Sequence, residues 1–460
     1  MSRGIRRRLL LWLSALLLSL MLAGIWLYRQ AETIVLAAEG YVFGSPLVLM
    51  DLTREASLRT LGPENHLRRV RQFPDARFRE VVRPNVDTLY TTAFIDLAQG
   101  PWVFHMPAAA QRYTLMAFLD GWTDVFGAPG TRTHGESGGT YLLLGPGQSA
   151  PPSLGMEVLQ ASTRMAWLIG RIETRSAQDL TEVHRLQDGL RLVTWRDWQA
   201  GVRTYPEPAW QAQPAGPAPL SRLLQMPAPE FFARLAGLMR DHPPRAQDAA
   251  MLRKLARLGI APGQGPDWNW SQRMAVRLGR WIADRRLAQE LDKTRAAPSG
   301  WQTPPDVLGD YGVAYNIRAA VARVGLGANA PKDALYPQAR VDRQGQALHG
   351  RHRYRLRFEA GSLPPVRAFW SITAYGVDDY LLHVPGARHA IKSSDPLVFN
   401  RDGSLDLLIQ AARPSSPHSN WLPVLADQGF VLNARLYWPA TPALQGSWQM
   451  PALERLPDSD

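Results

Sequence analysis

A long charge-free stretch near the start of the chain constrains the architecture more than any other feature. Residues 9–27 carry no charged side chain, and Arg3, Arg6, Arg7 and Arg8 precede them. A helix of this length spans roughly 28 Å, about the thickness of the hydrocarbon core of a bilayer. Because clustered arginines stay on the cytoplasmic side of a membrane, we expect the body of the protein to lie on the other side.

A cleaved signal peptide is the alternative interpretation of this stretch. The apolar run is long for a signal peptide, and the small residues Ala23 and Gly24 are followed by large apolar ones. We therefore expect residues 1–30 to form an uncleaved anchor. The protein would then be a single-pass protein of the inner membrane with its body in the periplasm, and the alternative is secretion after cleavage.

Composition describes a globular body and excludes several kinds of chemistry. The chain has 460 residues, of which 45% are hydrophobic and 20% are charged, so we expect more than one domain. There is no cysteine, which excludes disulfides, thiolate metal sites and a cysteine nucleophile. The net charge is +12, yet only four of the 52 basic residues are lysine and no nucleic-acid motif is present. We expect no nucleic-acid partner, and the charge instead suits an anionic ligand.

Three regions of the body differ in their periodicity. Strand patterns dominate from about 81 to 200, and residues 113–120 alternate so that Tyr113, Leu115, Ala117 and Leu119 share a face. A Pro- and Ala-rich linker follows at 206–221, and residues 222–327 have helical spacing. Strand patterns return from about 336.

Two later segments predict strands with one buried face. In residues 351–358 the alternation places His352, Tyr354, Leu356 and Phe358 inward. In residues 430–438 it groups an apolar set on one face, namely Phe430, Leu432, Ala434, Leu436 and Trp438. Short strands at regular spacing, separated by turns, are typical of a β-sandwich.

Several motifs resemble a known pair of families. The segment "NHLRRVRQFPDARFREVVRPNVDTLYTTAFIDL" resembles DUF1254, whose mark is Pro-Asn-x-Asp-Thr-Leu-Tyr, and "RTHGESGGTYLLLGPG" is similar to its Gly-rich strand. The segments "VARVGLGANAPKDALYP", "LPPVRAFWSITAYGVDDYLL", "SNWLP" and "ARLYWP" resemble the partner family, DUF1214. The resemblance covers roughly residues 37 to 455. The chain departs from the pattern at Val86, where the family often has a second Asn.

The resemblance implies two β-sandwich domains with a helical region between them, and it implies no settled reaction. We expect a mainly β fold with an α insert, with jelly-roll-like sandwiches and an N-terminal transmembrane helix. The expected divisions are an anchor at 1–30, a DUF1254-like domain at 31–210, a helical region at 211–335 and a DUF1214-like domain at 336–460.

The stretch "RPNVDTLY" is denser in polar groups than one turn requires. Thr88 and Tyr90 would share one face of a regular strand, and Asp87 would point the other way with Leu89. The motif therefore predicts a loop from Arg83 to Asp87 at the end of a strand, where binding sites are common. The alternative is that Asn85 and Asp87 cap a turn.

The candidate site residues come from this stretch and from other family-like segments. For ligand binding they are Asn85, Asp87, Asp120, Tyr375, Asn420 and Trp421. For catalysis they are Tyr90, Arg132, Tyr315 and Arg318. We expect no metal site and no cofactor, because no three-ligand histidine cluster, phosphate loop or dinucleotide motif is present.

Two classes of function fit these residues. The first is a module that binds a small or anionic carbohydrate-like ligand in a cleft between the β-sandwich domains. The alternative is a carbohydrate-active enzyme, either a lyase that eliminates across a uronate linkage or a hydrolase using Asp87 with Asp120 or Asp124. We expect Asn85 and Asp87 to lie near Arg318, where the first β domain meets the helical insert. The sequence leaves the oligomeric state open, including a homo-oligomer.

Overall fold

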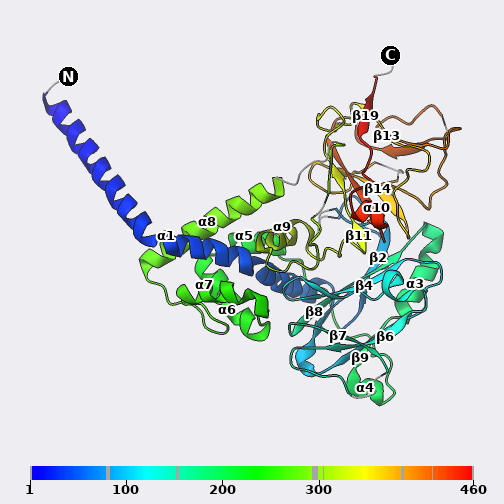
Figure 1. Cartoon of the computed structure of the whole chain (residues 1–460), viewed down its shortest axis with the longest axis horizontal. Coiled ribbons are helices and arrows are strands. Elements are labelled where there is room, and N and C mark those ends of the chain that lie inside the picture. Colours follow the sequence, from blue (N-terminus) through cyan, green and yellow to red (C-terminus); the bar gives the residue numbers. More distant parts are fainter. Residues whose placement is uncertain are drawn as a thin grey trace.

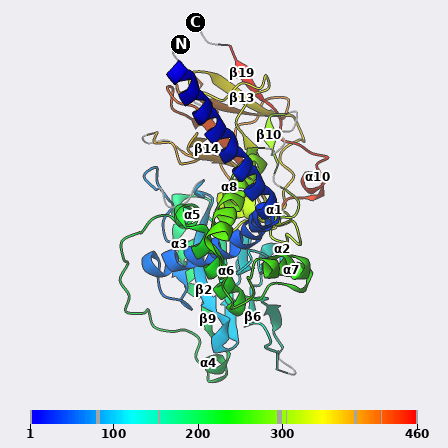
Figure 2. The same cartoon turned by 90° about the vertical axis from the view of Figure 1, so that its left-hand side faces the viewer.

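The computed structural model describes residues 3–78, 83–151, 155–292, 299–303, 305–384, 388–416 and 418–457. Helices hold 34% of the residues and strands 24%, so the fold mixes α and β structure instead of being mainly β as expected. Helices gather around one long N-terminal helix, and the strands form two β regions beside them (Figures 1 and 2).

Helix α1 (Arg3–Thr60) continues far beyond the expected anchor. Its first part is exposed and apolar, and an 18-residue window there has a mean hydropathy of 2.2 with none of it buried. This part projects from the body in Figure 1. Its length and composition fit one membrane span or a signal sequence. From Ile34 to Leu52 most side chains are buried, so burial begins just after the expected anchor at 1–30. This half packs with the helices, whereas the expected division assigned it to the first β domain.

Shorter helices pack around the second half of α1. They are α5 (Pro219–Gln225), α6 (Ala228–Asp241), α7 (Ala249–Arg257), α8 (Trp270–Asp292) and α9 (Tyr315–Gly325). Their apolar faces share one core with α1, which includes Tyr41, Phe231 and Leu255. The contact with α8 is close at Gly279, where an added Cβ would lie 2.4 Å from the carbonyl oxygen of Ile34.

The first β region contains two sheets that contribute to the same core. One sheet has the order β1-β2-β8-β4-β5 and the other β7-β6-β3-β9. Ile95, Phe118 and Leu168 from the first sheet meet Phe104 and Leu143 from the second. The strands are β1 (Arg68–Arg69), β2 (Thr88–Asp96), β3 (Trp102–Met106), β4 (Thr114–Asp120), β5 (Val125–Gly127), β6 (Gly139–Leu144), β7 (Glu157–Gln160), β8 (Met165–Glu173) and β9 (Arg191–Thr194).

The second β region is also built from two sheets around a shared core. The sheet orders are β10-β12-β18-β14-β15, with β11 also paired to β18, and β17-β16-β13-β19. The strands are β10 (Trp301–Gln302), β11 (Ala334–Leu335), β12 (Gln338–Ala339), β13 (Arg353–Phe358), β14 (Trp370–Gly376), β15 (Ala390–Lys392), β16 (Leu405–Gln410), β17 (Asn420–Pro423), β18 (Phe430–Tyr437) and β19 (Leu453–Leu456).

Short helices complete the two β regions. These are α2 (Thr131–His134), α3 (Leu180–Gly189), α4 (Trp195–Gln199) and α10 (Thr441–Leu444), with 3-10 turns η1 (Leu97–Gln99), η2 (Ala177–Asp179) and η3 (Ala246–Asp248). Helix α3 is amphipathic, and its Val183 and Leu186 enter the core of the first β region.

The predicted alternation holds in β13, but it fails at the end of β18. Tyr354, Leu356 and Phe358 are buried as expected. Trp438 does not join Phe430 and its partners in the core of the second β region, and instead packs at the junction with the first. The reason is local, because β18 ends at Tyr437 and Trp438 has a left-handed φ of 50°, which turns its side chain away from the alternating face.

The two β regions meet face to face. One end of this junction is an apolar cluster in which Phe94 and Leu115 of the first region pack with Phe369 and Tyr437 of the second. In Figure 1, β2 and β4 lie next to β11 and β14. The other end of the junction is polar and contains the loop that leads into β2.

Candidate functional site

The "RPNVD" stretch is a loop that leads into β2, as the sequence predicts. Arg83 has a left-handed φ of 50°, and β2 begins only at Thr88. The amide oxygen of Asn85 accepts hydrogen bonds from the backbone N–H groups of Asp87 (2.6 Å) and Thr88 (3.1 Å). Asn85 therefore caps the turn, as the alternative interpretation of this stretch predicts for this residue.

Asp87 has a different role and bonds across the junction. Its side chain is completely buried. One carboxylate oxygen, Oδ2, accepts hydrogen bonds from Ser371 Oγ (2.5 Å) and Tyr437 OH (3.2 Å), both in the second β region. The other oxygen, Oδ1, lies 3.9 Å from Lys392 Nζ. Asp87 thus connects the two β regions and does not cap the turn.

The same loop is held by Tyr375 and Arg435 from β14 and β18. Tyr375 OH donates to the carbonyl of Pro84 (2.8 Å), and Arg435 Nη2 donates to Tyr375 OH (2.6 Å) and to the carbonyl of Arg83 (3.1 Å). Burial lowers the pKa of Arg435, but the nearby Tyr375 and Asp87 raise it more, so the guanidinium stays charged.

Arg171 on β8 is a second buried guanidinium in this junction. It lies 5.2 Å from the ring centroid of Tyr90, and its Nη2 donates to the carbonyl of Gly327 (3.1 Å). Burial raises the pKa values of the neighbouring Tyr113 and Tyr336, so both phenols stay neutral. Within the described residues, neither Arg171 nor Arg435 forms an ion pair with a carboxylate.

Several buried polar atoms in this part of the structure have no hydrogen-bond partner among the described residues. They are Asp87 Oδ1, Thr88 Oγ1, Arg171 Nε, Asn329 Oδ1 and Asn433 Oδ1. Buried polar groups are nearly always paired in folded proteins, because leaving one unpaired costs about 1–3 kcal/mol. Both hydrogen-bond donors and acceptors are therefore available here, next to two guanidinium groups that form no ion pair among the described residues.

Three other predicted residues come together elsewhere. Arg318 is fully buried on α9, and its guanidinium carbon lies 5.3 Å from the ring of Tyr315 and 5.2 Å from that of Trp122. Asp120 and Asp124 contribute to the charge around Arg318. Burial, followed by the charge of Asp124, raises the pKa of Asp120 to about 6.

This arrangement corrects the expectation that Asp87 would lie near Arg318. Asp87 bonds to the second β region, whereas Arg318 contacts the rings of Trp122, Tyr315 and Phe43 on α1. The three nitrogens of Arg318 have no hydrogen-bond partner among the described residues. Burial lowers the pKa of Arg318, while Asp124 and Asp120 favour its charged form and the surrounding rings contact it as in a cation–π cluster.

The remaining candidates lie at the edge of the junction or away from it. Arg132 on α2 pairs with Asp333, its Nε lying 2.5 Å from Oδ1, and Tyr113 OH donates to the Asp333 carbonyl. Asn420 donates to the carbonyls of Val398 (2.8 Å) and Asp406 (3.0 Å), so its amide serves the second β region internally. Trp421 Nε1 likewise donates to the Gln410 carbonyl.

Sequence reasoning missed Ser371, Lys392, Arg435, Tyr437 and Arg171. A signal for some of them was present in "FVLNARLY". In this segment Asn433, Arg435 and Tyr437 alternate with the apolar residues and are large and polar. The strand they belong to is buried on both faces. Large polar residues at every second position of such a strand indicate that its other face is also packed against a neighbouring element.

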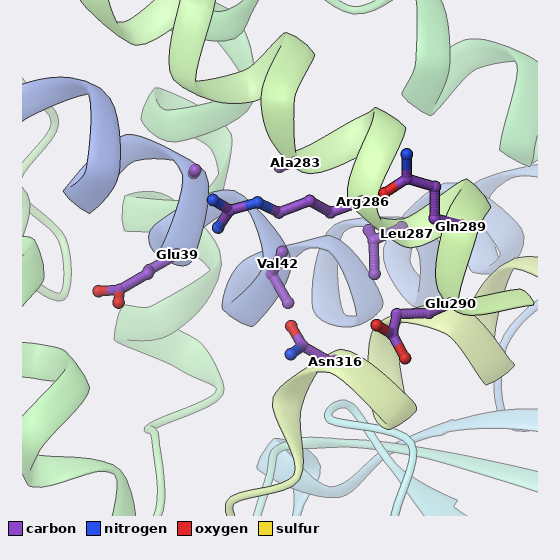
Figure 3. Close-up of a pocket in the computed structure, with 9 residues that line it drawn as sticks. Glu39, Val42, Ala283, Arg286, Leu287, Gln289, Glu290 and Asn316 are labelled. Carbon is purple, nitrogen blue, oxygen red and sulfur yellow. The ribbon is translucent and has the colours of Figure 1, made fainter. Parts of the chain in front are cut away.

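A pocket of about 400 Å³ lies elsewhere, between α1, α8 and α9 (Figure 3). Its walls carry Glu39, Arg286, Gln289, Glu290 and Asn316. We favour the junction as the candidate site because its charges are buried, whereas Arg286, Gln289 and Glu290 are exposed. Among the described residues, no group of three or more His, Asp or Glu side chains could hold a metal ion.

Comparisons with known proteins identify two family models and two similar solved structures. Two family models match, each described as a protein of unknown function: DUF1254 at residues 64–194 and DUF1214 at residues 333–441. The crystal structure of the VPA0106 protein from Vibrio parahaemolyticus matches with a TM-score of 0.71 and 22% identity, covering 92% of this chain and 100% of that one. An uncharacterized protein from Burkholderia cenocepacia matches with a TM-score of 0.46 and 12% identity, covering 95% and 98%. No curated protein matches.

Proposed function

Since the chain belongs to the family that joins a DUF1254 domain to a DUF1214 domain, we propose that it binds a small anionic, carbohydrate-like ligand between these two domains. We further propose that α1 anchors it in the inner membrane as a single span, with the body in the periplasm. The proposal treats each β domain as a β-sandwich, which the shared core of its two sheets supports.

One observation carries the ligand proposal: the positive charge buried at the junction is poorly compensated. Arg171 and Arg435 are buried, and their partners are carbonyls, hydroxyls and aromatic rings. Asp87 is shared with Lys392, Ser371 and Tyr437. A carboxylate on a ligand would pair with Arg171 through a charge-assisted hydrogen bond, which is stronger than a neutral one.

The surroundings of Arg171 also fit a ligand with hydroxyl groups. Tyr90 and Tyr336 are each partly exposed and lie beside the buried Arg171. Tyr336 OH is paired to Asn329 Nδ2 (2.8 Å), which leaves the amide oxygen of Asn329 free to accept. Tyrosine rings and amide groups are suited to the apolar faces and hydroxyls of a sugar.

Calorimetry with the full-length protein in detergent tests this proposal. We expect a galacturonate oligosaccharide to bind and a galactose oligosaccharide of equal length not to bind. Arg171→Met should weaken binding of the acidic ligand roughly tenfold or more. Arg185→Met is the matched control, because Arg185 is exposed on α3 and, among the described residues, pairs with Glu182 alone. Equal binding of both sugars, or no effect of Arg171→Met, would contradict an anion site at this position.

A second candidate function follows from the contact between Tyr90 and Arg171. In β-elimination, a base removes the proton on the carbon next to the ligand carboxylate, and the glycosidic C–O bond on the following carbon breaks as a C=C bond forms between these two carbons. The leaving oxygen then takes up the proton that the base has accepted. We propose Tyr90 as that base, and Arg171, 5.2 Å from its ring centroid, would stabilise the charge that develops on the carboxylate. An ultraviolet absorbance screen for the unsaturated product, using uronate polysaccharides, tests this function. Tyr90→Phe should then abolish product formation while the ligand still binds.

A further inference from the structure

Helix α8 has two faces of different character. One face is buried against α1 through small and apolar residues, with Ala275, Val276, Ala283 and Leu287 buried around the close contact at Gly279. This face explains how α8 packs on the second half of α1. It leaves the opposite face of α8 without a partner in the described structure.

The outward face of α8 carries large apolar residues and arginines at helical spacing. Positions 270, 274, 277, 281 and 285 follow one another at intervals of three or four residues, so they form one stripe. They are Trp270, Met274, Arg277, Trp281 and Arg285, and Trp270 and Trp281 are 75% and 52% exposed. The Arg285 guanidinium carbon lies 4.3 Å from the ring centroid of Trp281. Neither Arg277 nor Arg285 has an ion pair among the described residues.

The start of this stripe lies at the end of the apolar run of α1. Trp26 Nε1 on α1 donates a hydrogen bond to Ser271 Oγ on α8 (2.8 Å). Figures 1 and 2 show the same relationship, because α8 meets α1 where the projecting part of α1 enters the body. A bilayer that contains residues 10–27 would therefore have its surface close to the first turn of α8.

We propose that the outward face of α8, defined as Trp270, Met274, Arg277, Trp281 and Arg285, lies on the anionic surface of the bilayer that α1 crosses. This inference rests on the proposed anchoring of α1. It adds a second contact with the membrane, which fixes how the body is oriented over the lipid surface.

The side chains on this face are those that favour a lipid surface. Tryptophan is enriched at the headgroup level of membranes, because its ring is apolar while its N–H can still find a polar partner. Arginine stems lie along apolar surface while their guanidinium groups contact lipid phosphates. Each basic residue near an anionic leaflet strengthens association roughly fivefold. A partner protein could instead cover this face. The experiment below distinguishes the two, because lipid and protein shield a label on this face differently.

The absence of native cysteine permits single-cysteine labelling of the full chain. We would place an environment-sensitive fluorophore on Met274→Cys, and on Leu444→Cys as the matched control, since these residues are 36% and 38% exposed. A third label on Leu18→Cys reports on the anchor itself. The protein is reconstituted into vesicles of phosphatidylcholine and phosphatidylglycerol, and each label is tested with an aqueous quencher and with nitroxide-labelled lipid.

We expect nitroxide lipid to quench the labels at 18 and 274, and the aqueous quencher to reach only the label at 444. In one contrary result, nitroxide lipid quenches the label at 18 while the aqueous quencher reaches the labels at 274 and 444 equally well. That result would support the anchor and overturn the docking of α8. If the label at 18 is itself water-accessible, the anchoring proposal fails. A label at 274 that is shielded from water without lipid quenching indicates a protein contact and also overturns the inference.

Charge reversal tests the role of the arginines. Arg277→Glu with Arg285→Glu should lower the docked fraction of the label at 274, by at least about fivefold in the docking equilibrium for each arginine replaced. Arg413→Glu, an exposed arginine in the second β domain, is the matched control and should change nothing. Unchanged lipid quenching in the double variant would overturn the electrostatic part of the proposal.

Discussion

Ser371 donates a hydrogen bond of 2.5 Å to the buried carboxylate of Asp87, a residue 284 positions earlier in the chain. The bond joins the DUF1254 domain to the DUF1214 domain, and no solvent reaches Asp87 to replace it. The two domains are therefore coupled through a buried charge, which depends on each of its partners.

The first prediction concerns this bond. Ser371→Ala should lower the free energy of unfolding by about 1.5–3 kcal/mol, because a buried carboxylate loses a hydrogen-bond donor. Ser416→Ala, at an exposed position, should have little effect. Urea unfolding of the full-length protein measures both. In the Asp87→Asn background the effect of Ser371→Ala should shrink, and full additivity of the two changes would contradict the coupling.

The second prediction concerns the two faces of β13. Leu356 is fully buried, so Leu356→Ala should cost about 2–5 kcal/mol of unfolding free energy. Arg355 is about one-third exposed and pairs with Glu454 at 2.7 Å, so Arg355→Ala should cost about 1 kcal/mol or less. Equal losses in chemical denaturation would show that the strand does not have one buried and one solvent face.

A pair of helical glycines gives the third prediction. Gly279→Ala places a Cβ 2.4 Å from the Ile34 carbonyl oxygen and should destabilise the contact between α1 and α8 by about 1–3 kcal/mol. Gly237→Ala in α6 meets nothing within 4 Å and should stabilise the protein by roughly 0.5–1 kcal/mol through helix propensity. Opposite shifts in melting temperature are expected, and a stabilising Gly279→Ala would refute the close approach.

The fourth prediction is a pH dependence set by Asp120. Burial raises its pKa from 3.8 to about 6 in the folded state. As the pH rises from about 4 to 6, the unfolded chain loses this proton first, so the free energy of unfolding falls by about 3 kcal/mol from this group. Asp120→Asn should remove that fall, because the amide does not ionise.

His242 acts in the opposite direction and serves as the comparison. Burial lowers its pKa from 6.5 to about 4, so the unfolded chain gains a proton first as the pH falls through this window, and stability is lost toward acid. From pH 4 to 7 the free energy of unfolding should therefore change with pH in opposite directions, relative to the unsubstituted protein, for Asp120→Asn and His242→Gln. Parallel curves for the two variants would contradict both pKa shifts.

The sequence determined the features that depend on local periodicity. The apolar run of residues 9–27, the inward Tyr354, Leu356 and Phe358, and the loop before Thr88 could each be read from neighbouring residues. The physical reason is that alternation and helical spacing report which face of an element is buried. The motifs "RPNVDTLY" and "FWSITAY" also fixed the family, because they are long and specific.

Only the tertiary structure decided what covers each buried face. Periodicity shows that β18 has a buried face, but it does not reveal that Tyr437 on the other face bonds to Asp87, 350 positions away. Asp87 and Arg318 were expected together, and the fold separates them because the second β domain, rather than the helical region, packs on the loop before β2. Contacts of this kind depend on how whole domains dock, which no local pattern of side chains encodes.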